Sequence, residues 1–69
     1  MSDNEISAAE EVLLDWMRQA DRPVSRRDLL RRQPPEGVSP LGIRTALWSL
    51  VDRGAARETD DHRLEPTQR

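Results

Sequence analysis

The sequence predicts a mainly α-helical domain that is closed by a small β-hairpin, because three patterns follow one another along the chain. Apolar residues recur at helical spacing in three segments, which are separated by prolines. Each of these segments starts at a serine in the position of a helix cap. A glycine ends the third, and two short segments with a polar turn between them follow it. The 69 residues suffice for one small core and leave no room for a second domain.

The first helix is expected to begin at Ser7. Ser7 and Glu10 have the spacing of a capping box, in which both side chains satisfy backbone N–H groups of the first turn. Pro23 ends the apolar pattern that follows. Residues 1–6 are expected to form a disordered N-terminus. The apolar stripe of this helix consists of Ala9, Val12, Leu13, Trp16, Met17 and Ala20.

The second helix is expected over residues 26–33, with Ser25 as its cap. A double proline at 34–35 then separates it from the next segment. Two leucines of this helix are expected to face the core, namely Leu29 and Leu30. Two arginines that lie one turn apart are expected to face outward, namely Arg27 and Arg31.

The third helix carries the strongest signals and is expected over residues 40–53. Ser39 has the position of a cap, and Pro40 follows at the first helical position, where a missing N–H costs nothing. Gly54 directly after the segment is a typical helix stop. The apolar stripe of this helix consists of Ile43, Ala46, Leu47, Leu50 and Val51.

A hairpin is expected after Gly54. Residues 55–59 can pair with residues 63–65 across a turn at 60–62. Residues 66–69 are expected to form a disordered tail. Alanine and glutamate are poor strand formers, so the hairpin needs to pack against the helices to be stable.

Composition narrows the class of protein. The chain has no cysteine, so neither a disulfide nor a thiolate metal site supports the core. No apolar run approaches the length of a membrane span, and the first residues are acidic where a signal peptide is basic. A cytoplasmic protein without a membrane partner is expected.

Charge is divided unevenly along the chain, whose net charge is -2. Residues 1–21 carry six acids against Arg18, whereas residues 22–57 carry eight arginines against three acids. The remaining residues, 58–69, are again acidic, with four acids against two arginines. A basic middle segment of this kind can form a phosphate-binding surface, or it can simply be a solvated helix face.

The stretch 38–54, which reads VSPLGIRTALWSLVDRG, resembles the third helix of bacterial winged helix-turn-helix transcription regulators. It has a serine cap, an arginine after the first core aliphatic residue, an Ala-Leu pair, another leucine three residues on and a closing glycine. Together with the helix capped at Ser25 and the hairpin, the resemblance covers about residues 8–65. It implies a three-helix winged-helix domain over residues 7–65.

The resemblance further implies a small DNA-binding regulator. In that family the third helix enters the major groove, and the hairpin, or wing, lies along the backbone. Double-stranded DNA is then the expected partner, and a homodimer or a larger assembly would supply the area that one small domain lacks. Arg44 is the expected base-reading residue. The residues implied to contact DNA are Arg26, Arg27, Arg31, Ser39, Arg44, Thr45, Trp48, Arg57 and Arg63.

A different function follows from the same helix if its outward face is considered alone. Leu41, Trp48 and Asp52 fall together opposite the core stripe, on the side where a DNA-reading helix usually carries polar groups. This face predicts a protein-interaction module, an adaptor or an inhibitor, with Leu41 and Trp48 as its apolar anchors. Trp48 has two open interpretations: an interface anchor, or a side chain that folds back over the hairpin and completes the core.

No pattern of reactive residues is present in the sequence. There is no nucleophile triad, glycine-rich phosphate loop or zinc-ligand spacing, and His62 beside Asp60 and Asp61 is typical of a tight turn. The sequence therefore predicts a protein that is not an enzyme and that holds neither a metal nor a cofactor.

Overall fold

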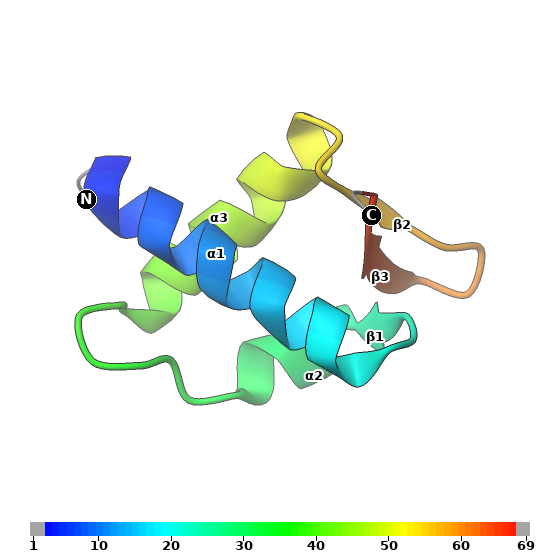
Figure 1. Ribbon diagram of the computed structural model, residues 1–69, viewed down its shortest axis with the longest axis horizontal. Helices are drawn as coiled ribbons and strands as arrows, with labels where there is room; N and C mark the ends of the chain where they lie inside the picture. Colours follow the sequence, from blue (N-terminus) through cyan, green and yellow to red (C-terminus); the bar gives the residue numbers. More distant parts are fainter. Residues whose placement is uncertain (1–2, 68–69) are drawn as a thin grey trace.

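Three helices and a small three-stranded antiparallel sheet make up the computed structural model, which describes residues 3–67 (Figure 1). The prediction of a mainly helical chain with a small β element is confirmed. The helices are α1 (Asp3–Ala20), α2 (Arg26–Arg31) and α3 (Pro40–Asp52). The strands are β1 (Val24–Ser25), β2 (Ala56–Glu58) and β3 (Arg63–Pro66).

Two of the three predicted serine caps are present. The backbone N–H of Asp28 donates to Ser25 Oγ over 3.1 Å, and that of Gly42 donates to Ser39 Oγ over 3.0 Å. Helix α2 ends at Arg31, two residues earlier than predicted, because Arg32 is already extended (ψ 144°) and the double proline follows closely. The two helix starts were readable from the sequence because each cap is a local interaction.

The predicted start of the first helix is wrong. Helix α1 begins at Asp3, so Ser7 lies inside the helix, and the residues from Asp3 to Ile6 are helical rather than disordered. Asp3 and Glu5 place negative charge in the first turn, where the helix dipole favours it. Glu10, predicted to close a capping box, pairs instead with Arg53 at the end of α3, at 3.3 Å. The prediction for residues 1–2 lies outside the described residues.

Helix α3 ends in a Schellman motif around Gly54, which has φ +80°. The N–H of Ala55 donates to the carbonyl of Leu50 over 2.9 Å, and the N–H of Gly54 to the carbonyl of Val51 over 3.2 Å. A left-handed backbone at this point turns the chain from the helix into β2, so the glycine sets the direction of the hairpin.

We expect Gly54→Ala to lower the free energy of unfolding by about 1–2 kcal/mol, because a Cβ at a positive φ is strained. Gly54→Asn is the control, since asparagine tolerates the left-handed region and should lose clearly less. Urea denaturation followed by circular dichroism measures both. Equal losses for the two variants would mean that the positive φ at this position is not what the glycine provides.

The sheet has the order β1-β3-β2 and is one strand larger than predicted. The predicted hairpin is formed by β2 and β3, with Arg57 opposite Glu65. On the other edge of β3, Val24 pairs with Leu64 and Ser25 with Arg63. The cap residue of α2 and the residue before it therefore also form a short strand. The predicted tail from residue 66 is wrong for its first two residues. Pro66 belongs to β3, and Thr67 donates from its N–H to the carbonyl of Ala55 over 3.0 Å; residues 68–69 lie outside the described part.

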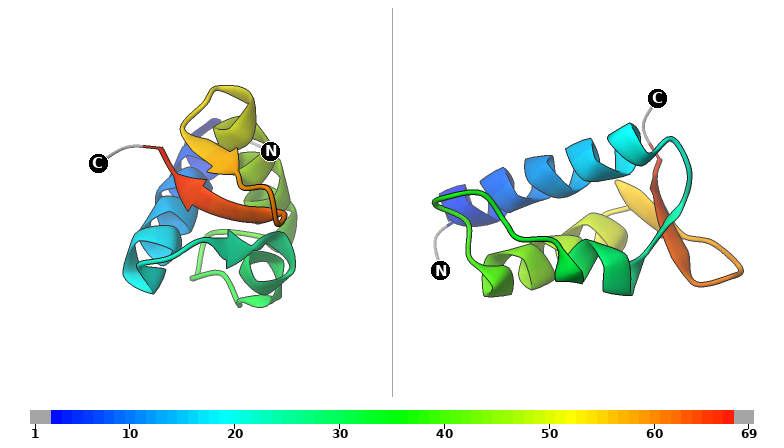
Figure 2. Two further views of the ribbon diagram at one scale, coloured as in Figure 1. Left: turned by 90° about the vertical axis from the view of Figure 1, so that its right-hand side faces the viewer. Right: turned by 90° about the horizontal axis from the view of Figure 1, so that it is seen from below.

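The core lies between α1 and the other elements. Helix α1 packs mainly on α3, and β3 also contacts it; Figure 2 shows the sheet at one end of the helices. Trp16, predicted to be in the core, is partly buried at its edge, with the guanidinium of Arg32 5.5 Å from the ring centroid. The buried residues are Ala9, Leu13, Leu14, Met17, Leu29, Ile43, Ala46, Leu47, Leu50, Ala56 and Leu64.

Candidate interaction surface on α2 and α3

An exposed apolar patch lies on the helices of the predicted DNA-binding segment. Within residues 3–67, the large hydrophobic side chains that are exposed are Trp48 at 75%, Leu41 at 61% and Leu30 at 37%. Leu41 and Trp48 are seven residues apart on α3 and therefore share one side of the helix. The prediction that Leu30 faces the core is wrong, because Leu29, one residue earlier and about 100° away, occupies that direction.

A shallow groove of about 240 Å³ runs between α2 and α3 along one side of Trp48. Leu30 and Leu47 contribute apolar surface to it, and Arg26 and Arg44 contribute charge. The surface continues past Arg26 and Trp48 to Val51 and Asp52. We call this combined surface, made by Arg26, Leu30, Leu41, Arg44, Trp48, Val51 and Asp52, the α2–α3 face.

The exposure of Trp48 decides between its two interpretations. Trp48 lies two residues before the fully buried Leu50, so it is on the opposite side of α3 from the core. The hairpin contributes its buried residues, Ala56 and Leu64, to the core side. The interpretation in which Trp48 folds back over the hairpin is therefore wrong.

Ser39 does not offer a free hydroxyl to a phosphate. Its Oγ accepts from the N–H of Gly42 and donates to Glu5 Oε2, 2.7 Å away. The Glu5 carboxylate thus stands beside the N-terminus of α3, where a DNA phosphate would otherwise be favoured by the helix dipole. This negative charge comes from α1, and no local pattern around Ser39 could have predicted it.

The two arginines predicted on the wing are paired with acids of the same hairpin. Arg57 Nε lies 2.5 Å from Glu65 Oε1, and Arg63 Nε lies 3.2 Å from Asp61 Oδ2. The Thr59 hydroxyl, which donates to Asp61, lowers the pKa of that carboxyl, and the positive charge of Arg63 acts in the same direction. These acids reduce the positive charge that the wing offers to a phosphate, but both arginine side chains stay exposed, at 71% and 52%.

The arginines of the helices are less engaged. Arg26 Nη2 lies 3.9 Å from Glu58 Oε1, a long contact between exposed groups. Arg27, Arg31 and Arg44 are exposed, and none of them has an acid within 4.0 Å among residues 3–67. Of the residues predicted to contact DNA, the structure therefore brings Arg26, Arg44 and Trp48 together, with Thr45 partly buried next to them.

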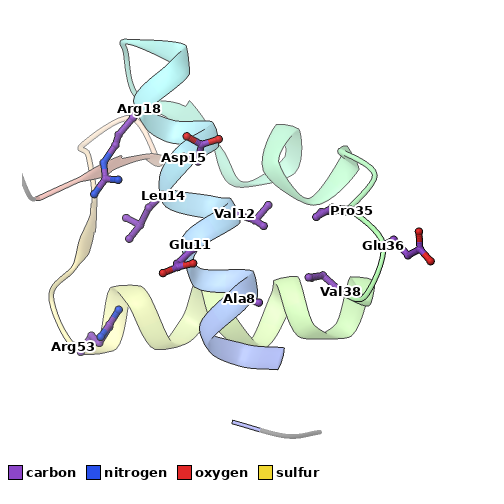
Figure 3. Close-up of a pocket in the computed structure, with 10 residues that line it drawn as sticks. All are labelled: Ala8, Glu11, Val12, Leu14, Asp15, Arg18, Pro35, Glu36, Val38 and Arg53. Carbon is purple, nitrogen blue, oxygen red and sulfur yellow. The ribbon is translucent and has the colours of Figure 1, made fainter. Parts of the chain in front are cut away.

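Among residues 3–67, no large hydrophobic side chain outside the α2–α3 face is exposed. Figure 3 shows a hollow along α1 in which Val12, Pro35 and Val38 lie on one side of the helix and Glu11 and Arg53 on the other. Across the described residues, no group of three or more histidine, cysteine or acidic side chains is placed to hold a metal ion. No helix in the same part of the chain is long and apolar enough to cross a membrane.

Comparison of the chain with models of protein families, with curated proteins and with solved structures finds no match. The winged-helix resemblance of residues 38–54 thus rests on the sequence pattern itself.

Proposed function

We propose that this chain is a winged-helix protein-interaction module that binds another polypeptide through the α2–α3 face. The observation that carries the proposal is the 75% exposure of Trp48 in the middle of that face. The order of helices and strands, with a hairpin after the third helix, is compatible with a winged helix.

Burial of this apolar surface supplies the driving force. A tryptophan buries about 150–250 Å² when it is covered, and each Å² of apolar surface is worth about 25 cal/mol. Leu41, two turns away on the same side of α3, extends the patch. Tryptophan and arginine are also the residues most enriched at binding hot spots, and Arg26 and Arg44 flank Trp48.

The second candidate function is binding of double-stranded DNA, as the resemblance implies. Three exposed arginines without an ion pair among residues 3–67, Arg27, Arg31 and Arg44, favour it. Three predicted phosphate contacts weigh against it, because Ser39, Arg57 and Arg63 are each bound to a carboxylate of the chain. Protein binding explains the exposed apolar surface, which phosphate contacts do not.

Titration of a Trp16→Phe variant with mixed-sequence duplex DNA separates the two functions, since Trp48 is then the only tryptophan. We expect no change in Trp48 fluorescence at either about 50 mM or about 200 mM salt. The lower salt concentration is the sensitive condition, because phosphate-driven binding is strongest there. A change at low salt that disappears at high salt, and is absent in Arg44→Glu, would favour DNA binding instead.

A photo-cross-linking amino acid with an aromatic ring, which keeps a ring in the place of the Trp48 anchor, is placed at position 48 to test the proposed surface in the native cell. We expect polypeptide adducts from position 48 and none from position 11, which is an exposed position on the outer side of α1. Adducts at neither position, or equal adducts at both, would contradict a polypeptide partner on the α2–α3 face.

A further inference from the structure

We infer that the polypeptide bound by the α2–α3 face is an acidic segment of another protein, in which aspartates or glutamates flank a bulky apolar side chain. This inference rests on the proposed function and names the chemistry of its partner. It follows from where the charged side chains of α2 and α3 stand relative to Trp48.

The groove between α2 and α3 has an arginine on each side and no acid among the described residues that line it. Arg26 comes from α2 and Arg44 from α3, and the rest of the lining is Leu30, Leu47 and Trp48. An apolar side chain that covers this groove therefore has positive charge on both sides. A carboxylate beside that side chain gains a charge-assisted hydrogen bond, whereas an ammonium group is repelled.

Around the axis of α2, the basic residues gather on the side of the groove. Each residue turns an α-helix by about 100°, so Arg27 and Arg31 lie about 60° and about 100° from Leu30, both away from the core. Asp28, the acid of this helix, lies about 160° from Leu30 and lines a different hollow, which includes Arg63. The edge that α2 presents beside the groove is therefore positive.

The arginines of this surface keep their charge available for a partner. Arg27, Arg31 and Arg44 have no acid within 4.0 Å among residues 3–67. Arg26 has a 3.9 Å contact with Glu58, and the two side chains are exposed at 51% and 41%, so water screens this pair. A carboxylate of the partner can therefore compete for Arg26.

Asp52, the acid of the α2–α3 face, limits where the charges of the partner can lie. By helical geometry, Arg44 lies about 40° to one side of Trp48 and Asp52 about 40° to the other. Leu47, which lines the groove, is on the same side of Trp48 as Arg44. We therefore expect the carboxylates of the partner on the Arg44 side and none beside Asp52, where like charges repel.

A second copy of this chain fits the surface less well. The outer side of α1 carries acids such as Glu11 and Asp15, which attract the arginines of α2. Among residues 3–67, however, no large hydrophobic side chain of α1 is exposed, so α1 has no apolar anchor to place beside Trp48. The partner that fits combines acids with an apolar anchor, and we place it on another protein.

Fluorescence anisotropy of dilute labelled peptides, titrated with the chain, tests the inference. The probe is a peptide of about four helical turns in which leucines repeat at helical spacing and glutamates fill the other positions. One control peptide has lysine for each glutamate, and the other has serine for each leucine. We expect the glutamate–leucine peptide to bind below about 1 mM chain, and each control to bind about tenfold more weakly or less.

Arg44→Glu tests the sign of the partner's charge. It should weaken binding of the glutamate–leucine peptide about tenfold and strengthen binding of the lysine–leucine peptide. Opposite responses of one variant also show that it is folded. Arg18→Glu makes the same charge change on α1 and should alter either affinity less than about twofold at about 0.1 M salt, where distant charges are screened.

Asp52→Asn provides a second test on the same helix. Removal of this acid should strengthen binding of the glutamate–leucine peptide about two- to threefold, because a repulsion disappears. A weaker complex would mean that Asp52 itself receives a positive charge from the partner, which contradicts an acidic segment.

Two further results would overturn the inference. One is a glutamate–leucine peptide that does not bind at chain concentrations up to about 1 mM. The other is a lysine–leucine peptide that binds the native chain as tightly. Cross-linking of position 48 to a basic or uncharged polypeptide would refute the acidic partner and leave the proposed function standing. Equal binding of the glutamate–serine peptide, together with salt-dependent binding of duplex DNA, would refute both, because the surface would then bind anions in general.

Discussion

Leu50→Ala should lower the free energy of unfolding by about 3–4 kcal/mol, within the range of leucine-to-alanine changes in protein cores. Leu50 is fully buried in the last turn of α3, and its truncation leaves a cavity in the core that α3 shares with α1 and the sheet. A domain of this size is expected to be stable by roughly 3–10 kcal/mol in total, so the variant should lose much of its stability. Urea denaturation followed by circular dichroism at 222 nm measures the loss.

Leu41→Ala is the matched control for this change. It removes the same atoms from the same helix, but Leu41 is 61% exposed. Its effect on the free energy of unfolding of the monomer should stay within about 0.5 kcal/mol. A large loss for Leu41→Ala at low chain concentration would mean that this side chain belongs to the core, and that the α2–α3 face is smaller than described.

Ser39→Ala should lower the free energy of unfolding by about 1–2 kcal/mol, toward the upper end of the range for serine caps. The substitution removes the acceptor for the N–H of Gly42 and also the donor to Glu5 Oε2. Ser25→Ala, which removes a cap with one bond to the N–H of Asp28, should cost about 1 kcal/mol and serves as the control.

A double-mutant cycle separates the two contributions of Ser39. Combined with Glu5→Gln, Ser39→Ala should show a coupling of about 0.5–1 kcal/mol, since the two side chains share a charge-assisted hydrogen bond. The same cycle with Ser25→Ala should be additive, because Ser25 caps a different helix. If the Glu5–Ser39 cycle is additive as well, the carboxylate does not hold the start of α3.

The two candidate functions of α3 exclude one another on the same face. A helix whose outward side is covered by a protein partner has no surface left to enter a major groove. A partner on the α2–α3 face would therefore keep Arg44 away from DNA.

The sequence by itself determined the caps of α2 and α3, the end of α3 and the existence of the hairpin. Ser25, Ser39 and Gly54 each act through hydrogen bonds or backbone angles within a few residues, so their effect is visible in a local pattern. The outward position of Trp48 was likewise predicted as one of two alternatives, because helical periodicity places it opposite the apolar stripe.

Tertiary structure decided what depends on residues far apart in the chain. Strand β1 exists because Val24 pairs with Leu64, and Arg57 forms an ion pair because Glu65 lies across the hairpin. Glu5 reaches Ser39 across 34 positions of sequence. None of these contacts has a local signal, since their partners are brought together only when α1, α3 and the sheet pack around one core. The same packing pairs Arg57 and Arg63, which were predicted to contact phosphates, with acids of the hairpin, and it leaves Trp48 exposed.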